Sequence, residues 1–591
     1  MTTRPSGGAH RTGLMRWAFS AWAAVLLAIG LSTLPTGALA QRGYIAPEAA
    51  TGYSEKSLAQ AKSYMVSAAN PLAVEAGVRI LQEGGSAVDA AIAVQLVLNL
   101  VEPQSSGIGG GAFLLHWDAE TKELKSYDGR ETAPAAARPD RFLRDGRRIP
   151  FDEAVHSGLS IGVPGLVRLL EEVHRRHGKL PWARLFEPAI ALAENGFPVS
   201  PRLNLLLTWM GAENFDPAAR RLYFSENGSA WPVGYRLKNP EFAGTLRRIA
   251  EEGAEAFYSG EIAEKIVAAA ANAPNHRGDI TLADLAAYKS VERPPICVIY
   301  RRHRVCGMGP PSSGGIAVAQ TLKLLEPFDL GRGPEAALNP RAMHLIAEAE
   351  KLAFADRDYY IGDPDFVQVP LTLLDSDYLA ARSQLINPNA AMPRPAPGTP
   401  PGVQRQAFGL DSTLESVGTS HFSVVDAEGN AVSMTTTIES AFGSRVLAAG
   451  FLLNNELTDF SFLPTDAEGR PIANAVAPGK RPRSSMAPTI VFDDEGRLKA
   501  VLGSPGGSRI ILYVVKALIA LIDWELDAQA AAALVNFGSR GGPFEIEYDP
   551  ATDWRALVRP WLSTPPLWQA MRVKPFGHEI VPDLLTSGLH I

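Results

Sequence analysis

The segment from Val417 to Glu439 constrains the fold of this chain more than any other part of the sequence. Two strand-like runs flank Asp426-Ala-Glu-Gly-Asn430, which suits a three-residue hairpin loop with Gly429 in the left-handed conformation. In that register Thr437 lies directly opposite Thr419, whereas a slip of one residue would send the two side chains to opposite faces. The pattern predicts an antiparallel hairpin in which two hydroxyl groups meet.

Thr419 also stands at the first position of its strand, directly after Gly418. If the peptide bond between them were cut, Thr419 would carry a hydroxyl nucleophile and a free α-amine base in one residue. Such an amine titrates near pH 8, so a useful neutral fraction exists at neutral pH. The alternative is that Thr419 and Thr437 are β-branched residues that pack across a sheet.

The composition excludes several classes of protein. The chain has 591 residues, of which 46% are hydrophobic and 20% are charged, as in a soluble globular protein with a large core. A mixed net charge of -7 does not suit a nucleic-acid binder, so small-molecule chemistry is expected. Two cysteines supply neither a disulfide framework nor a Cys-rich zinc site, and we expect no metal and no organic cofactor.

Residues 1–40 predict a secretory signal. Three arginines precede the uncharged stretch 17–34, and Ala38-Leu39-Ala40 supplies small residues where signal peptidase reads them. An uncleaved anchor is the alternative, because the uncharged run from Trp17 to Gln41 could nearly span a bilayer. We expect an exported protein, periplasmic or secreted, with no stable membrane span after the signal is removed.

Export to an oxidising compartment raises the question of whether Cys297 and Cys306 are bonded. They lie in two short strand-like runs around Arg301-Arg302, and a two-residue turn there would place the cysteines opposite each other. That turn lacks the Asn-Gly or Asp-Gly that fixes such a register, so two free buried thiols remain an equal alternative.

Helical and extended patterns divide the remaining chain. Pro, Gly and polar residues without a hydrophobic period predict an exposed, poorly ordered connector over about 387–416. Helices are predicted over 70–83, 86–101, much of 166–288 and 508–524, and strands over 112–117, 125–130, 421–426, 431–439, 489–493 and 498–503.

Four further segments carry candidate chemistry. Gly158-Leu-Ser-Ile-Gly162 matches the nucleophile elbow of serine hydrolases, but Pro164 stands where the helix of that motif should begin. The glycine amides of Gly503-Ser-Pro-Gly-Gly-Ser508 precede a helix and suit an oxyanion. Hydroxyls and cations of 480–488, with carboxylates of 454–459, suit the two charged ends of an amino-acid-like substrate.

Six motifs in this order resemble the gamma-glutamyltransferase (gamma-glutamyl transpeptidase, glutathione hydrolase) family of N-terminal nucleophile hydrolases. The resemblance implies an α+β fold, a four-layer αββα sandwich, made as a precursor that cuts itself between Gly418 and Thr419. A large subunit (41–418) and a small subunit (419–591) would stay associated around one core. The motifs are Gly84-Gly-Ser-Ala-Val-Asp-Ala-Ala91, Asp128-Gly-Arg-Glu-Thr-Ala-Pro134, Pro310-Pro-Ser-Ser-Gly-Gly315, Gly418-Thr-Ser-His421, Arg481-Pro-Arg-Ser-Ser-Met486 and Gly503-Ser-Pro-Gly-Gly-Ser508.

The resemblance also implies a reaction and a role for each matching residue. Attack by Thr419 on a gamma-glutamyl amide such as glutathione would give a gamma-glutamyl ester, and water or an amino-acid or peptide amine would then take the acyl group. By this resemblance Thr419 would be the nucleophile, Thr437 would tune it, and Gly506 and Gly507 would form the oxyanion hole. The residues that would bind the substrate carboxylate are Arg130, Ser484 and Ser485, and those that would bind the substrate ammonium are Glu439, Glu456 and Asp459.

Glu439 and Glu456 depart from the family pattern, because other members carry Asn and Gln there. Both changes add negative charge beside a substrate ammonium, so substrate or acceptor choice is expected to differ. Three alternatives stay open: a glutaryl (cephalosporin) acylase of the same fold, a serine hydrolase that uses Ser160, and a non-catalytic periplasmic amino-acid-binding protein.

Overall fold

The computed structural model describes residues 56–403, 408–413, 415, 418–548 and 571–575. The predicted signal, residues 1–40, lies outside the described residues. Within them, no helix combines the length and the apolar character that a membrane crossing requires. The described chain mixes helices with several β-sheets, which agrees with the expected α+β class.

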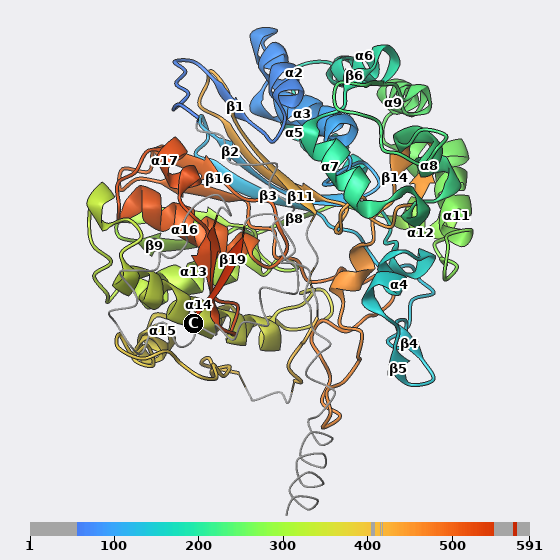
Figure 1. Cartoon of the computed structure of the whole chain (residues 1–591). Coiled ribbons are helices and arrows are strands. Elements are labelled where there is room, and N and C mark those ends of the chain that lie inside the picture. Colours follow the sequence, from blue (N-terminus) through green and yellow to red (C-terminus); the bar gives the residue numbers. More distant parts are fainter. Residues whose placement is uncertain (1–55, 404–407, 414, 416–417, 549–570, 576–591) are drawn as a thin grey trace, which may run out of the picture. The chain divides into compact units, whose positions relative to one another are not determined.

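The larger sheet has six antiparallel strands in the order β1-β11-β12-β2-β3-β8 (Figure 1). Its central hairpin has the predicted register: Thr419 pairs with Thr437, and Gly429 in the loop has a φ of 86°. The register prediction is therefore confirmed. The strands are β1 (Met65–Ser67), β11 (Thr419–Val425), β12 (Ala431–Thr437), β2 (Gly111–Asp118), β3 (Glu123–Gly129) and β8 (Val291–Arg293).

A second sheet has four antiparallel strands in the order β16-β15-β10-β9. Cys297 and Cys306 pair across β9 and β10 and form a disulfide with a Cα–Cα distance of 4.1 Å, so the bonded alternative is confirmed. Arg301 and Arg302 adopt positive φ values of 47° and 81° in the turn. Contacts of the Arg301 guanidinium with Asp523 and nearby carbonyls stabilise this turn without a glycine. The strands are β9 (Ile296–Tyr300), β10 (His303–Gly307), β15 (Thr489–Phe492) and β16 (Leu498–Leu502).

The two sheets contact each other through a small apolar cluster and a few polar bonds. Leu115 and Trp117 of the larger sheet pack with Ile490 and Phe492 of the smaller one. Beside them the Ser433 hydroxyl donates to the Leu502 carbonyl at 3.0 Å. These contacts tie the hairpin that carries Thr419 to β15 and β16.

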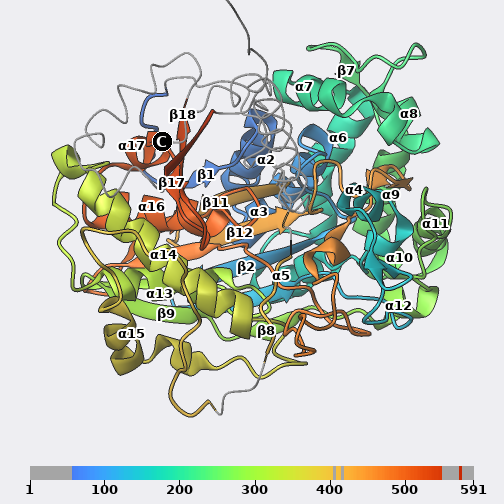
Figure 2. The same cartoon turned by 60° about the horizontal axis from the view of Figure 1, so that its bottom comes forward.

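Helices bury the outer faces of both sheets. Figures 1 and 2 show α2 and α3 on one side of the larger sheet and α13 and α14 beyond the smaller one. Asn70 and Ser86 cap α2 and α3 as predicted. The longer helices are α2 (Pro71–Gln82), α3 (Ala87–Val101), α5 (Leu166–His177), α6 (Glu187–Asn195), α7 (Pro201–Met210), α9 (Pro240–Glu252), α11 (Gly260–Ala271), α13 (Gly314–Leu325), α14 (Pro340–Tyr360), α15 (Ser376–Ser383) and α16 (Ile510–Ile522).

The described part of the connector is mostly exposed or half-buried, as expected, but a few of its groups are bonded to the core. The amide of Gly398 donates to Asp356 of α14 at 2.8 Å, and Asp411 is buried against Arg483 at 2.9 Å. Backbone and acidic groups of the connector bind charged side chains of the core, an order that hydrophobic periodicity does not reveal. Residues 404–407, 414 and 416–417 lie outside the described residues.

Candidate active site

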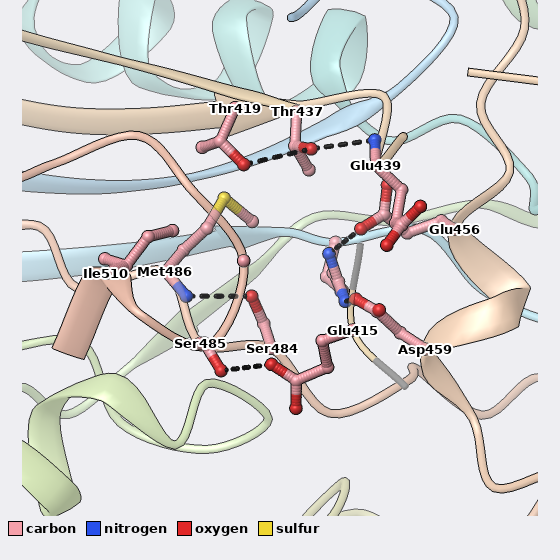
Figure 3. Close-up of a pocket in the computed structure, with 12 residues that line it drawn as sticks. Glu415, Thr419, Thr437, Glu439, Glu456, Asp459, Ser484, Ser485, Met486 and Ile510 are labelled. Carbon is pink, nitrogen blue, oxygen red and sulfur yellow. Dashed lines mark hydrogen bonds and ion pairs between the residues drawn. The ribbon is translucent and has the colours of Figure 1, made fainter. Parts of the chain in front are cut away.

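The start of β11 and the end of β12 bring two threonine hydroxyls together (Figure 3). The Thr419 hydroxyl donates to that of Thr437, with 3.5 Å between the oxygens. The Thr437 hydroxyl donates in turn to the Gly418 carbonyl at 2.6 Å and accepts the Glu439 amide at 2.8 Å. The hydroxyl of Thr419 is therefore linked through Thr437 to a peptide carbonyl that is already polarised by a hydrogen bond.

Glu439 follows β12 with a positive φ of 76°, a left-handed conformation that costs a non-glycine residue about 1–2 kcal/mol. The Ser440 hydroxyl and the Asn455 amide each donate to its carboxylate at 2.6 Å. These bonds hold the strained turn that aims the Glu439 amide at Thr437.

Both threonines line a pocket, and the predicted site residues gather around it. Gly418 and Gly506 are the exceptions. Gly506 lies in the turn before α16 with a φ of 102°, while its neighbour Gly507 lines the pocket. The lining residues are Arg130, Glu415, Thr419, Thr437, Glu439, Glu456, Asp459, Ser484, Ser485, Met486, Gly507 and Ile510.

Arg130 is already paired inside this pocket. Its guanidinium contacts the Glu456 carboxylate and donates to Asp459 at 2.6 Å, and its side chain is only 1% exposed. Burial raises the pKa of Glu456 and of Asp459 well above the usual range, although the charge of Arg130 acts in the opposite direction. Burial likewise raises the pKa of Glu131 to about 8. This end of the pocket therefore has more carboxyl groups than cations.

Ser484 and Ser485 lie on the other side of the pocket. The Ser485 hydroxyl donates to Glu415 at 2.7 Å and accepts from the Arg357 guanidinium at 2.6 Å. The Ser484 hydroxyl accepts the Met486 amide at 3.1 Å. The serines and Arg130, expected together around one carboxylate, thus share a pocket but have different partners.

Ser160, the serine of the nucleophile-elbow match, has a structural role. Ser160 is fully buried, and its hydroxyl contacts the carbonyls of Val155 and Ser157 at 2.9 and 2.8 Å. It is not among the residues that line the pocket. Within the described residues, no cluster of His, Cys, Asp and Glu has the makings of a metal site.

Comparison with known proteins shows the family to which a chain with this pocket belongs. The Gamma-glutamyltranspeptidase family model matches residues 73–559. The chain belongs to this family. The glutathione hydrolase proenzyme of Bacillus subtilis strain 168 is 39% identical over 479 residues, which cover 80% of this chain and 79% of that protein. The glutathione hydrolase proenzyme of Escherichia coli K12 is 39% identical over 498 residues, with 83% of each chain covered.

A solved structure extends the likeness to the described fold. The cephalosporin acylase of Bacillus halodurans aligns with a TM-score of 0.75 at 28% identity and covers 89% of this chain and 92% of that one. Gamma-glutamyltranspeptidases and an acylase therefore share this architecture.

Sequence reasoning missed Glu415, Met486 and Ile510 in this gamma-glutamyltranspeptidase pocket. Met486 is the last residue of one of the six motifs and Ile510 lies at the start of a helix predicted to be buried, so both were expected to be core residues. Glu415 lay in the segment expected to be exposed, and its partner Arg357 is 58 residues away. Its distance of four residues from Thr419 was the one available signal.

The excess of carboxyl groups predicts an unusual pH dependence of stability. A carboxyl whose pKa is raised by folding stabilises the protein below about pH 4.5 and loses that contribution as the pH rises through the folded-state pKa. Glu456→Gln should therefore raise the free energy of unfolding at pH 8 by roughly 1–3 kcal/mol and leave it nearly unchanged at pH 4.5. Urea titrations at both pH values measure this.

Asp365→Asn serves as the control, because Arg293 lowers the pKa of Asp365 and its loss should have the opposite sign at neutral pH. A Glu456→Gln variant that is less stable than the wild type at pH 8 contradicts the raised pKa.

Proposed function

We propose that this protein is a gamma-glutamyl hydrolase and transferase that acts on glutathione-like amides. The Thr419–Thr437 pair in an acid-rich pocket is the observation that carries this proposal. Three carboxyl side chains line that pocket besides Glu415, which suits a donor with an ammonium group better than one without it.

We also propose that the chain is exported and cut once. Removal of residues 1–40 and cleavage after Gly418 would leave subunits of 41–418 and 419–591. Attack of the Thr419 hydroxyl on the Gly418 carbonyl forms an ester and frees the α-amine of Thr419, and water then hydrolyses the ester. The hydrogen bond from Thr437 to that carbonyl and the word proenzyme in the relatives' names support this step.

The mature site then works by a ping-pong course. The free α-amine takes the proton of the Thr419 hydroxyl, which attacks the gamma-carbonyl and forms a gamma-glutamyl ester while the amine returns that proton to the leaving amine. Water or an acceptor amine then attacks the ester and frees the Thr419 hydroxyl. Thr437 tunes the nucleophile, and Gly506 and Gly507 stabilise the oxyanion. Arg130, Ser484 and Ser485 bind the substrate carboxylate end, and Glu439, Glu456 and Asp459 bind its ammonium group.

The fold proposed for both subunits is a four-layer αββα sandwich. The contacts between the two sheets and the helices that bury their outer faces support this arrangement.

Anilide substrates test the function against the acylase alternative, which the likeness to a cephalosporin acylase favours. The gamma-glutamyl and glutaryl p-nitroanilides differ only in the ammonium group of the acyl part. We expect kcat/KM to be at least about tenfold higher for the gamma-glutamyl compound, since a charged hydrogen bond contributes roughly 1.5–3 kcal/mol. A preference for glutaryl would identify an acylase, and cleavage of neither would refute the proposal.

A further inference from the structure

His421 belongs to the same motif as Thr419 but has no part in the reaction proposed above. It lies on β11 two residues after Thr419, so both side chains point to the same face of the larger sheet. That face meets β16, because the Ser423 hydroxyl of β11 donates to the Val501 carbonyl at 3.2 Å. The candidate nucleophile and His421 therefore share the face against which β16 packs.

Hydrogen bonds at both ring nitrogens fix the imidazole of His421. Its Nδ1 lies 2.9 Å from the Thr435 hydroxyl, and its Nε2 lies 3.1 Å from the Ser423 hydroxyl. Because the Ser423 hydroxyl gives its proton to the Val501 carbonyl, it accepts from Nε2, and Nδ1 is left to accept from Thr435. Burial lowers the pKa of His421 to about 3, which agrees with this neutral ring. The imidazole is thus held in one orientation.

The ring of His421 fills the space beside Gly503, the residue that follows β16. A Cβ placed on Gly503 would lie 2.3 Å from Nδ1 and 2.4 Å from Cε1 of His421, far inside van der Waals contact. The φ of Gly503 is not in the left-handed region, so φ does not demand a glycine there. The imidazole, rather than a left-handed conformation, therefore requires a glycine at this position.

Gly503 begins the turn 503–508, which leads from β16 to α16 and brings Gly507 to the wall of the pocket. A displacement of Gly503 by the ring would move the rest of this short turn with it. An oxyanion donor works only within about 2.7–3.1 Å of the oxygen that it stabilises. The contact between His421 and Gly503 thus affects the position of the amides that are proposed to face the reacting carbonyl.

We propose that His421 is a positioning residue whose ring sets the distance between Thr419 and the turn 503–508. Through that distance it aims the amides of Gly506 and Gly507 at the oxyanion. The inference rests on the proposed function and adds to it a residue that does not itself contact the substrate. Loss of the ring should therefore lower kcat and leave substrate binding nearly unchanged.

A double-mutant cycle on His421 and Gly503 tests this, with kcat counted per cut molecule. We expect Gly503→Ala to lower kcat by about 100-fold and to leave KM within about threefold, because the new Cβ displaces the turn. In a His421→Ala background there is room for that Cβ, so the same change should alter kcat by no more than about threefold. His421→Ala alone should lower kcat by about tenfold at a nearly unchanged KM. His421→Gln, which keeps a donor for Ser423, should recover part of that loss.

His116→Ala and Gly244→Ala are the matched controls. His116 is a buried histidine of β2 whose ring stacks on His177, and burial lowers its pKa to about 3 as well. Among the described residues, a Cβ on Gly244 of α9 would meet nothing within 4 Å. Both changes should leave kcat and KM within about threefold of the wild type.

Two anilides separate a failure of this inference from a failure of the proposed function. An oxyanion forms on gamma-glutamyl and on glutaryl p-nitroanilide alike, so the cycle is measured on whichever of the two the wild type cleaves faster. A preference for glutaryl refutes the proposed function and leaves the expected coupling of His421 and Gly503 unchanged. An equal loss from Gly503→Ala with and without His421, or a wild-type kcat in His421→Ala, overturns the inference.

Urea unfolding in the uncut Thr419→Ala background shows whether each variant folds. If Gly503→Ala does not fold, the split between kcat and KM in His421→Ala and His421→Gln decides. A loss confined to kcat supports the positioning role, and a loss confined to the amount of folded protein overturns it.

Discussion

A Thr419→Ala variant should remain one uncut chain and should lose activity on gamma-glutamyl anilides by a factor on the order of 10⁵. The change removes the only hydroxyl that donates to Thr437 among the described residues and leaves the polarised Gly418 carbonyl without a nucleophile. Denaturing electrophoresis follows the cut, and N-terminal sequencing of the smaller piece should begin at Thr419 in the wild type.

Ser160→Ala provides the control for this variant. The Ser160 hydroxyl bonds only to main-chain carbonyls in the described structure and lies outside the pocket, so the variant should still be cut and should still turn over substrate. Full activity from an intact wild-type chain would sink the N-terminal threonine mechanism.

Arg130→Met should destabilise the protein by about 3–5 kcal/mol at pH 7, because it leaves buried carboxyl groups without their cation. Glu456 is 1% exposed and Asp459 is 11% exposed, so neither regains water easily. Urea unfolding in the uncut Thr419→Ala background measures the change on a single chain.

Arg141→Met is a matched control for the loss of a buried guanidinium. The Arg141 side chain is 2% exposed, but its partner Asp279 is 32% exposed and regains hydration when the arginine is gone. Arg141→Met should therefore lower the free energy of unfolding clearly less than Arg130→Met does. A loss of stability from Arg130→Met no larger than that from Arg141→Met would contradict the role of Arg130 as the cation that stabilises the buried carboxyl groups.

The hairpin was predictable because local chemistry determines it. A glycine at the left-handed loop position and two alternating strands specify one register, and the register alone places Thr437 against Thr419. The helix caps at Asn70 and Ser86 are local in the same way, since each side chain binds an amide two or three residues ahead.

The pairing of charges inside the pocket was beyond the reach of such rules. Arg130 meets Glu456 across 326 residues of sequence, and Glu415 meets Ser485 across 70. Any of the nearby arginines could pair with any of the nearby acids on charge alone, so only the packed fold decides the partners. The bonds between the connector and the core were missed for the same reason, because they are ionic contacts and hydrogen bonds and leave no apolar period in the sequence.

The strand order has a consequence for the life of the molecule after a cut. Strands β11 and β12 lie between β1 and β2, and β15 pairs with β10 in the second sheet, so each sheet contains strands from both sides of residue 418. Two subunits that share both sheets in this way would not dissociate on dilution, because neither subunit alone contains a complete sheet. Cleavage would make assembly a one-way event: a mature molecule that unfolds must find its register between two separate chains, and its durability is set by how slowly it opens.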